Sequence, residues 1–244
     1  MNILAGVFPA DSGEVEFNEK KIRKMTIQQS EKLGIAFVHQ ELNLFNDLKV
    51  YENIFLMKEY KKKPGILDKK RMIRETQQLF TELGVEIEPE EKVENLKTSQ
   101  KQLLEISKAL FFQAKLLILD EPTAGLDPAG RDEILDLVAR MHRERNMTVI
   151  LVSHSMEDVA KYVERIIVMN HGQVMFDDTP KEVFRHYKEL ETIGLAAPQV
   201  TYLMHELKEH GLSVDTEATT VEEARASLMQ ALTGIDSGRS DIHR

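Results

Sequence analysis

Two adjacent carboxylates, Asp120 and Glu121, follow a run of four apolar residues at positions 116–119. An apolar run bounded by a turn predicts a strand buried on both faces, as in a parallel sheet covered by helices. Side chains alternate along a strand, so the two carboxylates point in different directions. One can hold Mg²⁺, which prefers carboxylate and water oxygens, while the other can polarise a water that attacks a phosphorus atom. Taken alone, the pair is equally well explained as a core strand that ends in two solvated acids.

Two further polar residues follow predicted strands. Gln40 comes after the apolar segment 35–38, and His154 comes after the apolar segment 147–152. Ligands of parallel α/β sheets bind beyond the carboxyl ends of the strands, so we expect both residues at the edge that carries Asp120. The alternatives are an ordinary polar loop residue for Gln40 and a surface or core residue for His154.

Two helix starts complete the set of candidate residues. The segment Leu96-Lys97-Thr98-Ser99-Gln100 opens a helix that runs to about residue 112. Its first turn offers free N–H groups and a positive dipole end to an anion, although Ser99 is also a candidate N-cap. Asp127 precedes a proline at the first position of another helix, which makes it an N-cap, a functional residue or both.

The composition narrows the class of function. The chain has 244 residues, with 32 basic against 41 acidic side chains and a net charge of −9, so we expect no nucleic-acid partner. The four lysines within residues 58–63 indicate a solvated segment rather than a binding patch. The absence of cysteine excludes disulfides and thiolate chemistry. No apolar run approaches the roughly 18 residues that span a bilayer, so a membrane role requires a partner.

The order and spacing of these motifs resemble those of ATP-binding cassette ATPases, over about residues 1–190. The resemblance assigns one family motif to each segment: the Q-loop to Gln40, the signature to residues 96–100, the Walker B strand to the segment ending at Asp120-Glu121, the D-loop to residues 124–127 and the switch histidine to His154.

The resemblance implies ATP and Mg²⁺ as cofactors and a role for each site residue. Asp120 and Gln40 hold Mg²⁺, Glu121 is the general base, and Gln40 and His154 position water and the γ-phosphate. Lys97, Ser99, Gln100 and Asp127 contact nucleotide or communicate across a pair of subunits. The signature departs from the family pattern Leu-Ser-Gly-Gly-Gln, because Lys97 replaces its serine and Ser99 its second glycine.

The glycine-rich P-loop of that family is missing from the sequence, which contains no Gly-Lys-Ser or Gly-Lys-Thr. Residues 1–6 predict the tail of a helix stopped by Gly6. We therefore expect a chain truncated at its start that binds ATP weakly. The resemblance suggests that the missing strand would lie beside the Walker B strand.

The predicted fold class is α/β, a P-loop-NTPase-like and mainly parallel sheet with a helical signature subdomain and a short C-terminal helical extension. We expect an ATPase domain at 1–188, with its helical subdomain at about 48–112, and an extension at 189–244 that frays from residue 233. A hairpin within residues 165–176 is expected to close the sheet. Residues 1–120 resemble carbohydrate-importer cassettes, and residues 122–244 resemble energy-coupling-factor transporter ATPases, so a recombinant chain is an alternative to a truncated one.

The resemblance implies an ATP-binding and ATP-hydrolysing subunit of an importer, which couples hydrolysis to solute uptake through a membrane permease. Such a chain would lie at the cytoplasmic face of the cell membrane and pair with a second cassette ATPase, identical or different. The alternative is a degenerate, nucleotide-poor cassette that acts as a docking or dimerisation module.

Overall fold

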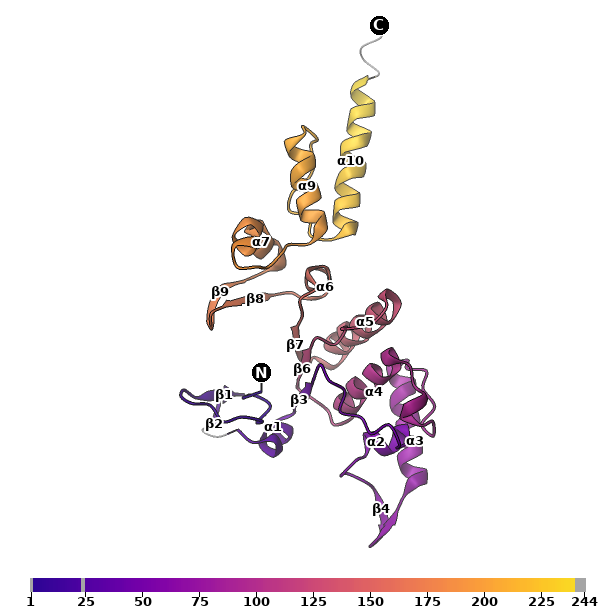
Figure 1. The fold of residues 1–244 in the computed structure, drawn as a ribbon. Coiled ribbons are helices and arrows are strands. Elements are labelled where there is room, and N and C mark those ends of the chain that lie inside the picture. The colour runs from indigo at the N-terminus through magenta and orange to yellow at the C-terminus, as the bar shows by residue number, and fades with distance from the viewer. Residues whose placement is uncertain (1, 23–24, 240–244) are drawn as a thin grey trace. The chain divides into compact units, whose positions relative to one another are not determined.

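A computed structural model describes residues 2–22 and 25–239 of the chain, which form two compact units (Figure 1). The first unit ends at Val152 and the second begins at Ser153. The domain boundary between residues 188 and 189 remains a prediction. Each unit is described by itself.

The first unit is organised around three parallel strands, β3 (Ile35–Val38), β6 (Leu116–Asp120) and β7 (Thr148–Val152). Their order is β3-β6-β7, with Ile35 opposite Leu116 and Leu116 opposite Thr148. The buried parallel strand predicted at 116–119 is therefore confirmed. The suggestion that a further strand lies beside it is wrong, because β3 and β7 already pair with both edges of β6.

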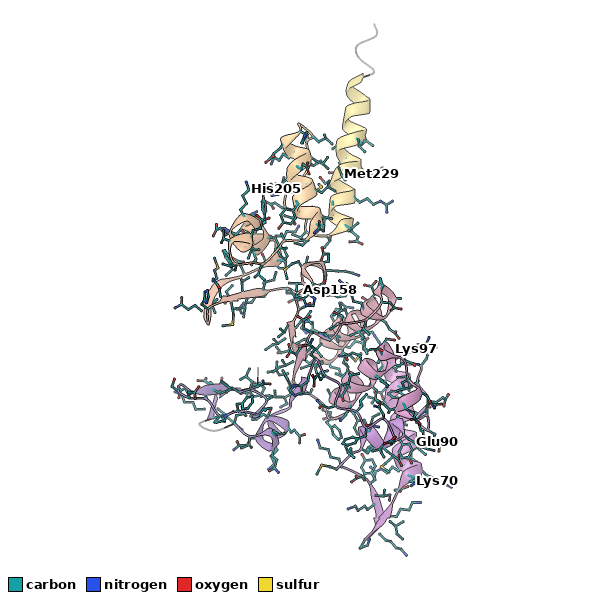
Figure 2. The ribbon with its side chains drawn as sticks, in the orientation of Figure 1. Lys70, Glu90, Lys97, Asp158, His205 and Met229 are labelled. Carbon is teal, nitrogen blue, oxygen red and sulfur yellow. The ribbon has the colours of Figure 1, made fainter. Side chains whose placement is uncertain are left out.

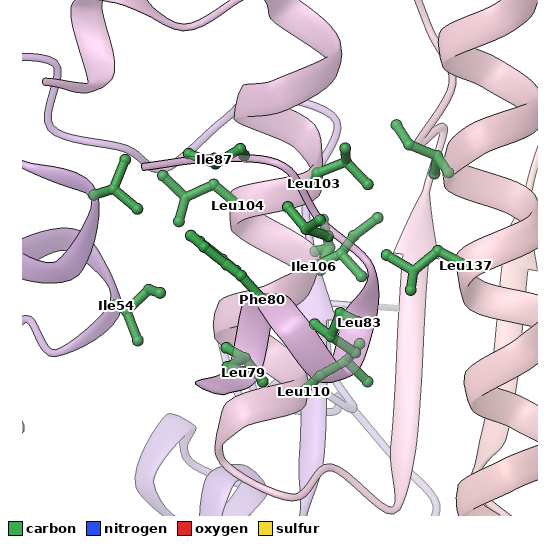
Figure 3. Packing of buried hydrophobic residues seen from close by; sticks show 14 of the residues in the cluster. Ile54, Leu79, Phe80, Leu83, Ile87, Leu103, Leu104, Ile106, Leu110 and Leu137 are labelled. Atoms are coloured by element: carbon green, nitrogen blue, oxygen red, sulfur yellow. The ribbon is translucent and has the colours of Figure 1, made fainter. Parts of the chain in front are cut away.

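Both faces of β6 are covered. Leu117 and Leu119 point into a cluster with four helices, α2 (Val50–Ile54), α3 (Lys69–Leu83), α4 (Thr98–Phe111) and α5 (Pro128–Arg145). Phe80 of α3 lies beside Leu104 of α4 in this cluster (Figure 3). Leu116 and Ile118 point to the opposite face, where they pack with residues of α1 (Ile27–Leu33), β1 (Val15–Phe17) and β2 (Lys20–Ile22). Alternate side chains of β6 thus pack into two different hydrophobic clusters, one on each face of the sheet.

Local signals set the helix ends. Asp68 begins α3 by accepting a 3.2 Å hydrogen bond from the backbone N–H of Arg71, and Thr26 begins α1 in the same way. Gly84 ends α3 with φ 65°, a left-handed conformation that a residue without Cβ adopts easily.

Residues 2–7 form a turn rather than a regular helix. The N–H of Gly6 donates to the carbonyl of Ile3, and the N–H of Val7 donates to that of Asn2. This pair of bonds is the Schellman pattern that closes helices, so the predicted stop at Gly6 is confirmed. Gly6 has φ 77°, and a Cβ built on it would lie 2.2 Å from the backbone carbon of Thr26. The position therefore excludes any side chain.

The lysine-rich segment is a hairpin of β4 (Lys61–Lys63) and β5 (Ile66–Leu67), inserted between α2 and α3. All three lysines of β4 are exposed, which agrees with a solvated segment. The expectation of helix throughout the subdomain missed this hairpin.

The second unit contains β8 (Ile166–Asn170), β9 (Gln173–Asp178) and five helices. These are α6 (Met156–Tyr162), α7 (Pro180–Arg185), α8 (Tyr187–Thr192), α9 (Gln199–Glu209) and α10 (Val221–Arg239). The hairpin is confirmed, but β8 and β9 form a two-stranded sheet of their own instead of closing the parallel one. The helix α10 ends at Arg239, and residues 240–244 lie outside the described part. The fraying predicted from residue 233 remains a prediction. No helix in the described ranges has the length and apolar character needed to cross a bilayer.

Candidate functional site

The carboxyl ends of β3 and β6 bring two predicted residues to one edge of the sheet. Val38 pairs with Leu119, so Asp120 continues β6 beside the segment of chain that leads to Gln40. Asp120 is half-buried and Gln40 is exposed. The carboxylate and the amide therefore lie where ligands of parallel sheets bind.

Glu121 has an uncommon backbone conformation at this edge. Its φ is 48°, in the left-handed region that residues with a side chain rarely adopt. Its N–H donates to the carbonyl oxygen of Val152 at 2.9 Å, and its own carbonyl accepts from the N–H of Ala124 at 3.1 Å. Strain of this kind costs of order 1–3 kcal/mol and clusters at functional sites. The chain thus leaves the extended path of β6 at Glu121.

Asp127 begins α5. Its Oδ1 accepts a 2.8 Å hydrogen bond from the N–H of Gly130, and Pro128 occupies the first helical position. The predicted structural role of Asp127 is confirmed, and its role in communication across subunits remains a prediction.

The signature segment forms the N-terminus of α4. Lys97 is the N-cap residue (Figure 2), and its backbone N–H donates to Oε1 of Gln100 at 3.1 Å. The suggestion that Ser99 caps this helix is wrong, because Ser99 lies inside the first turn. The first i→i−4 hydrogen bond of α4 runs from the N–H of Lys101 to the carbonyl of Lys97. The N–H groups before Lys101 are therefore not used in i→i−4 bonds of the helix, and they form its positive end.

Ser99 packs against the start of α5. A Cβ built on Gly130 would lie 3.0 Å from the Cβ of Ser99 and 3.0 Å from Oδ1 of Asp127. The serine that replaces a family glycine is therefore accommodated by a glycine on the neighbouring helix. This contact joins the signature segment to the first turn of α5, which follows the D-loop in the chain.

His154 lies two residues beyond β7 and belongs to the second unit. Its neighbours form the start of α6, where Ser155 is the N-cap and its N–H donates to Oγ of Ser153 at 3.0 Å. The role of His154 at the γ-phosphate remains a prediction.

The donor set fits Mg²⁺ held together with a phosphate ligand. Asp120 and Gln40 offer hard oxygen atoms, the type that Mg²⁺ binds. No group of three or more histidine, aspartate or glutamate side chains able to hold a metal occurs within the described ranges. A cation at this edge would therefore need water and phosphate oxygens as well, which is usual for Mg²⁺ in nucleotide sites.

Sequence reasoning missed Glu105, in the middle of α4. Only 8% of the residue is exposed, and burial raises the pKa of its carboxyl above the ordinary value of 4.5. Lys108, the backbone N–H of Asn43 and His39 act in the opposite direction. The sequence contained one signal of this burial, which is an acidic residue directly between two large apolar residues, Leu104 and Ile106, in a predicted helix.

Comparison with known proteins identifies relatives of two kinds. The chain is 37% identical over 232 residues to the energy-coupling factor transporter ATP-binding protein EcfA2 of Clostridium tetani, covering 93% of this chain and 79% of that protein. It is 42% identical over 183 residues to the ribose import ATP-binding protein RbsA of Lactococcus lactis, covering 75% of this chain and 37% of that one. A family model described as "ABC transporter" matches residues 1–124, and one described as "AAA domain, putative AbiEii toxin, Type IV TA system" matches residues 98–158.

Solved structures similar to this one include the following two. The first is cbiO1 from Clostridium perfringens, described as part of the ABC transporter complex cbiONQ. It has a TM-score of 0.64 and 30% identity, covering 84% of this chain and 80% of that one. The second is the ADP conformation of MJ1267, an ATP-binding cassette of an ABC transporter, with a TM-score of 0.67 and 79% coverage of each chain. Its identity of 23% shows the likeness of fold alone.

Proposed function

Because the chain belongs to the ATP-binding cassette family of transporter ATPases, we propose that it is the subunit of an importer that couples ATP hydrolysis to solute uptake. Relatives of both predicted kinds match, so the mixed resemblance is confirmed, as is the α/β cassette fold. ATP hydrolysis is the activity of this family.

The backbone of Glu121 is the observation that carries the proposal. Glu121 has a backbone φ of 48°, directly follows a buried strand and is adjacent to a second acidic residue. A catalytic base must be fixed at the edge of the sheet, and a constrained backbone of this kind is suited to that role. In this proposal Glu121 accepts the proton of the attacking water. Asp120 and Gln40 hold Mg²⁺, which neutralises phosphate charge when bound.

The remaining residues have supporting roles. The first turn of α4 at Lys97, Ser99 and Gln100 receives the γ-phosphate held by a second subunit, through backbone N–H groups and the positive helix end. His154 orients the γ-phosphate and the water. Asp127 links this site to the opposite subunit, and the packing of both Asp127 and Ser99 around Gly130 supports a joint movement of the two motifs.

The proposed partners are a membrane permease and a second cassette ATPase, with the chain at the cytoplasmic face of the membrane. The relatives are named for an energy-coupling factor transporter and for ribose import, and cbiO1 is described as part of a transporter complex. These names support an importer without deciding the solute. The C-terminal helices α9 and α10 would contribute to subunit pairing.

A docking or dimerisation module that binds nucleotide poorly is the second candidate. It is favoured by Lys97 and Ser99 in the signature, where the family pattern has serine and glycine. Backbone N–H bonds to phosphate contribute roughly 1.5–3 kcal/mol each, so three fewer would weaken binding by over about 10³-fold.

Calorimetry and phosphate release separate the two candidates. Mg·ATP is titrated into residues 1–244 and into the same chain preceded by a family P-loop strand and loop. Binding and hydrolysis by the extended chain, both lost in Asp120→Ala, would support the ATPase. No hydrolysis by the extended chain, alone or in the presence of permease, would favour the docking module.

A further inference from the structure

The hairpin of β4 and β5 and its flanks carry a positive charge that the rest of the chain does not share. Residues 57–71 contain seven basic and two acidic side chains, a net charge of +5, within a chain whose net charge is −9. Residues 61–67 are all exposed, and the hairpin extends away from α2 and α3 (Figure 1). Charges more than about 8 Å apart are largely screened at physiological ionic strength. The hairpin therefore meets a partner through its own field rather than through that of the acidic chain.

Four of the seven basic side chains are available to a partner. The other three form ion pairs with acidic residues at 2.8–3.6 Å, and these are Lys58, Lys62 and Arg71. The available four form no ion pair with any residue that the structure describes, and these are Lys61, Lys63, Lys69 and Lys70. Their ammonium groups can therefore bind anions without first breaking an ion pair within the chain.

Apolar side chains stand directly beside two of these lysines. The antiparallel register places Lys61 opposite Leu67 and Lys63 opposite Ile66, because it shifts between the two lysines. Directly opposite side chains lie on the same face of a hairpin and are neighbours. Ile66 is 55% exposed and Leu67 is 41% exposed. This pairing suits a boundary between water and hydrocarbon, where apolar groups enter the hydrocarbon and ammonium groups stay at the level of the phosphates.

The base of the hairpin is fixed to the helical cluster. The N–H of Asp68 donates to the carbonyl of Tyr60 at 2.7 Å. The ring of Tyr60 lies 5.1 Å from the ring of the buried Phe55, and the guanidinium of Arg71 lies 3.8 Å from the centre of the Tyr60 ring. The tip is thus presented from an ordered base, which reduces the entropy lost when it binds a surface.

We propose that the hairpin at residues 61–67 is a peripheral contact for an anionic phospholipid bilayer. The lysines bind headgroup phosphates, and Ile66 and Leu67 enter the interface. Exposed lysines alone agree with a solvated segment, but their pairing with exposed apolar residues favours a lipid surface. A nucleic acid is disfavoured, because residues 61–67 contain no arginine or aromatic side chain.

This contact goes beyond the proposed function and is independent of nucleotide. It lies on the bilayer without crossing it, and it adds lipid to the membrane contacts that a permease would provide. Loss of ATP hydrolysis would leave the lipid contact standing, and loss of vesicle binding would leave the ATPase standing. The two proposals can therefore fail separately.

Flotation with vesicles tests the contact on residues 1–244. Vesicles of phosphatidylcholine with phosphatidylglycerol should bind the chain, vesicles of phosphatidylcholine alone should not, and 1 M salt, where the Debye length is about 3 Å, should release it. Each basic residue near an anionic surface contributes about fivefold to binding, so Lys61→Gln/Lys63→Gln should weaken it roughly 30-fold. Lys20→Gln/Lys21→Gln is the matched control, because it removes the same charge from two exposed lysines of β2.

Fluorescence tests the apolar part of the contact. The chain contains no tryptophan, so a single one introduced by substitution reports its own surroundings. Emission from Ile66→Trp should shift to shorter wavelength with anionic vesicles and stay unchanged with neutral ones. Val174→Trp is the control, because Val174 of β9 is 57% exposed, close to the value for Ile66. Its emission should not shift with either kind of vesicle.

Four outcomes would overturn the lipid contact. They are no binding to anionic vesicles, equal binding to neutral ones, equal weakening in the two double variants, and unchanged emission from Ile66→Trp in the presence of anionic vesicles. Duplex DNA gives a separate arm. If the chain bound DNA but not vesicles, and Lys61→Gln/Lys63→Gln abolished that binding, the basic hairpin would be a nucleic-acid contact and the lipid proposal would be wrong.

Discussion

The backbone N–H of Glu121 donates to the carbonyl oxygen of Val152, one step beyond the last paired residues of β6 and β7. This bond extends the ladder past the end of β6 although Glu121 has left the extended conformation. The candidate base is therefore held by the neighbouring strand as well as by its own.

Glu121→Gln should slow ATP hydrolysis while leaving nucleotide binding intact. Positioned proton transfer contributes about 10²–10⁴-fold, and glutamine keeps the size of the side chain but cannot accept the proton at neutral pH. Steady-state phosphate release by the P-loop-extended chain measures the effect, with the exposed Glu133→Gln on α5 as control. Near-normal turnover would mean that a residue other than Glu121 is the general base.

Asp127→Ala should lower the free energy of unfolding by about 0.5–2 kcal/mol, because α5 loses its N-cap. Asp127→Asn keeps an acceptor oxygen and should be close to the wild type in equilibrium urea unfolding. A loss of hydrolysis in the stable Asn variant would reveal a separate role for the charge. Wild-type stability of the Ala variant would show that the cap does not matter.

Gly130→Ala should destabilise the chain by about 1–3 kcal/mol, because the new methyl group meets the Cβ of Ser99 and Oδ1 of Asp127. The cost should be smaller in a Ser99→Gly background, where one of these two contacts is gone. A double-mutant cycle by urea unfolding gives the coupling energy. Additive effects would mean that the two helices do not share this contact.

Gly6→Ala should destabilise the chain far more than Gly65→Ala. Both residues have positive φ, of 77° and 81°, so both substitutions incur left-handed strain of about 1–2 kcal/mol. The Cβ at position 6 also meets the backbone of Thr26 and Ile27, whereas nothing lies within 4 Å of a Cβ at position 65. Thermal unfolding of the two variants compares them, and equal losses would contradict the packing at Gly6.

Glu105→Gln should flatten the dependence of stability on pH. The folded-state pKa of Glu105 is raised, so between pH 4.5 and that pKa the folded chain binds more protons than the unfolded chain. The free energy of unfolding contributed by this group therefore falls as pH rises through the window. The difference between wild type and variant, measured by urea unfolding at several pH values, should shift in favour of Gln as pH increases. The opposite slope would mean that the influences that lower this pKa, with Lys108 the largest of them, outweigh burial.

Features with local signals were predictable from sequence. The strand at 116–119, the Asp127 cap and the stop at Gly6 each depend on a few neighbouring residues. The hairpin of β4 and β5 was also within reach, because Pro64-Gly65 is a turn signal that the helical composition around it obscured.

Features that depend on tertiary proximity could not be predicted. The sequence suggested Ser99 as the N-cap of α4, but the residue with the extended backbone of an N-cap is Lys97. Ser99 instead packs near Gly130 of another helix. The burial of Glu105 likewise depends on the packed tertiary structure, and no spacing rule in the sequence predicts it. The strand order β3-β6-β7 likewise could not be predicted, because the residues of β6 do not determine which strands pair with it.

The parallel pairing of residue 35 with residue 116 also has a kinetic consequence. All of α2, α3 and α4 lie in the chain between these partners, and their apolar faces belong to one cluster. Closing so long a loop is entropically unfavourable until its contents are compact, so pairings of this kind form slowly. Refolding should therefore show helical circular dichroism in an early phase, and protection of the Leu117 and Ile118 amides only in a later one.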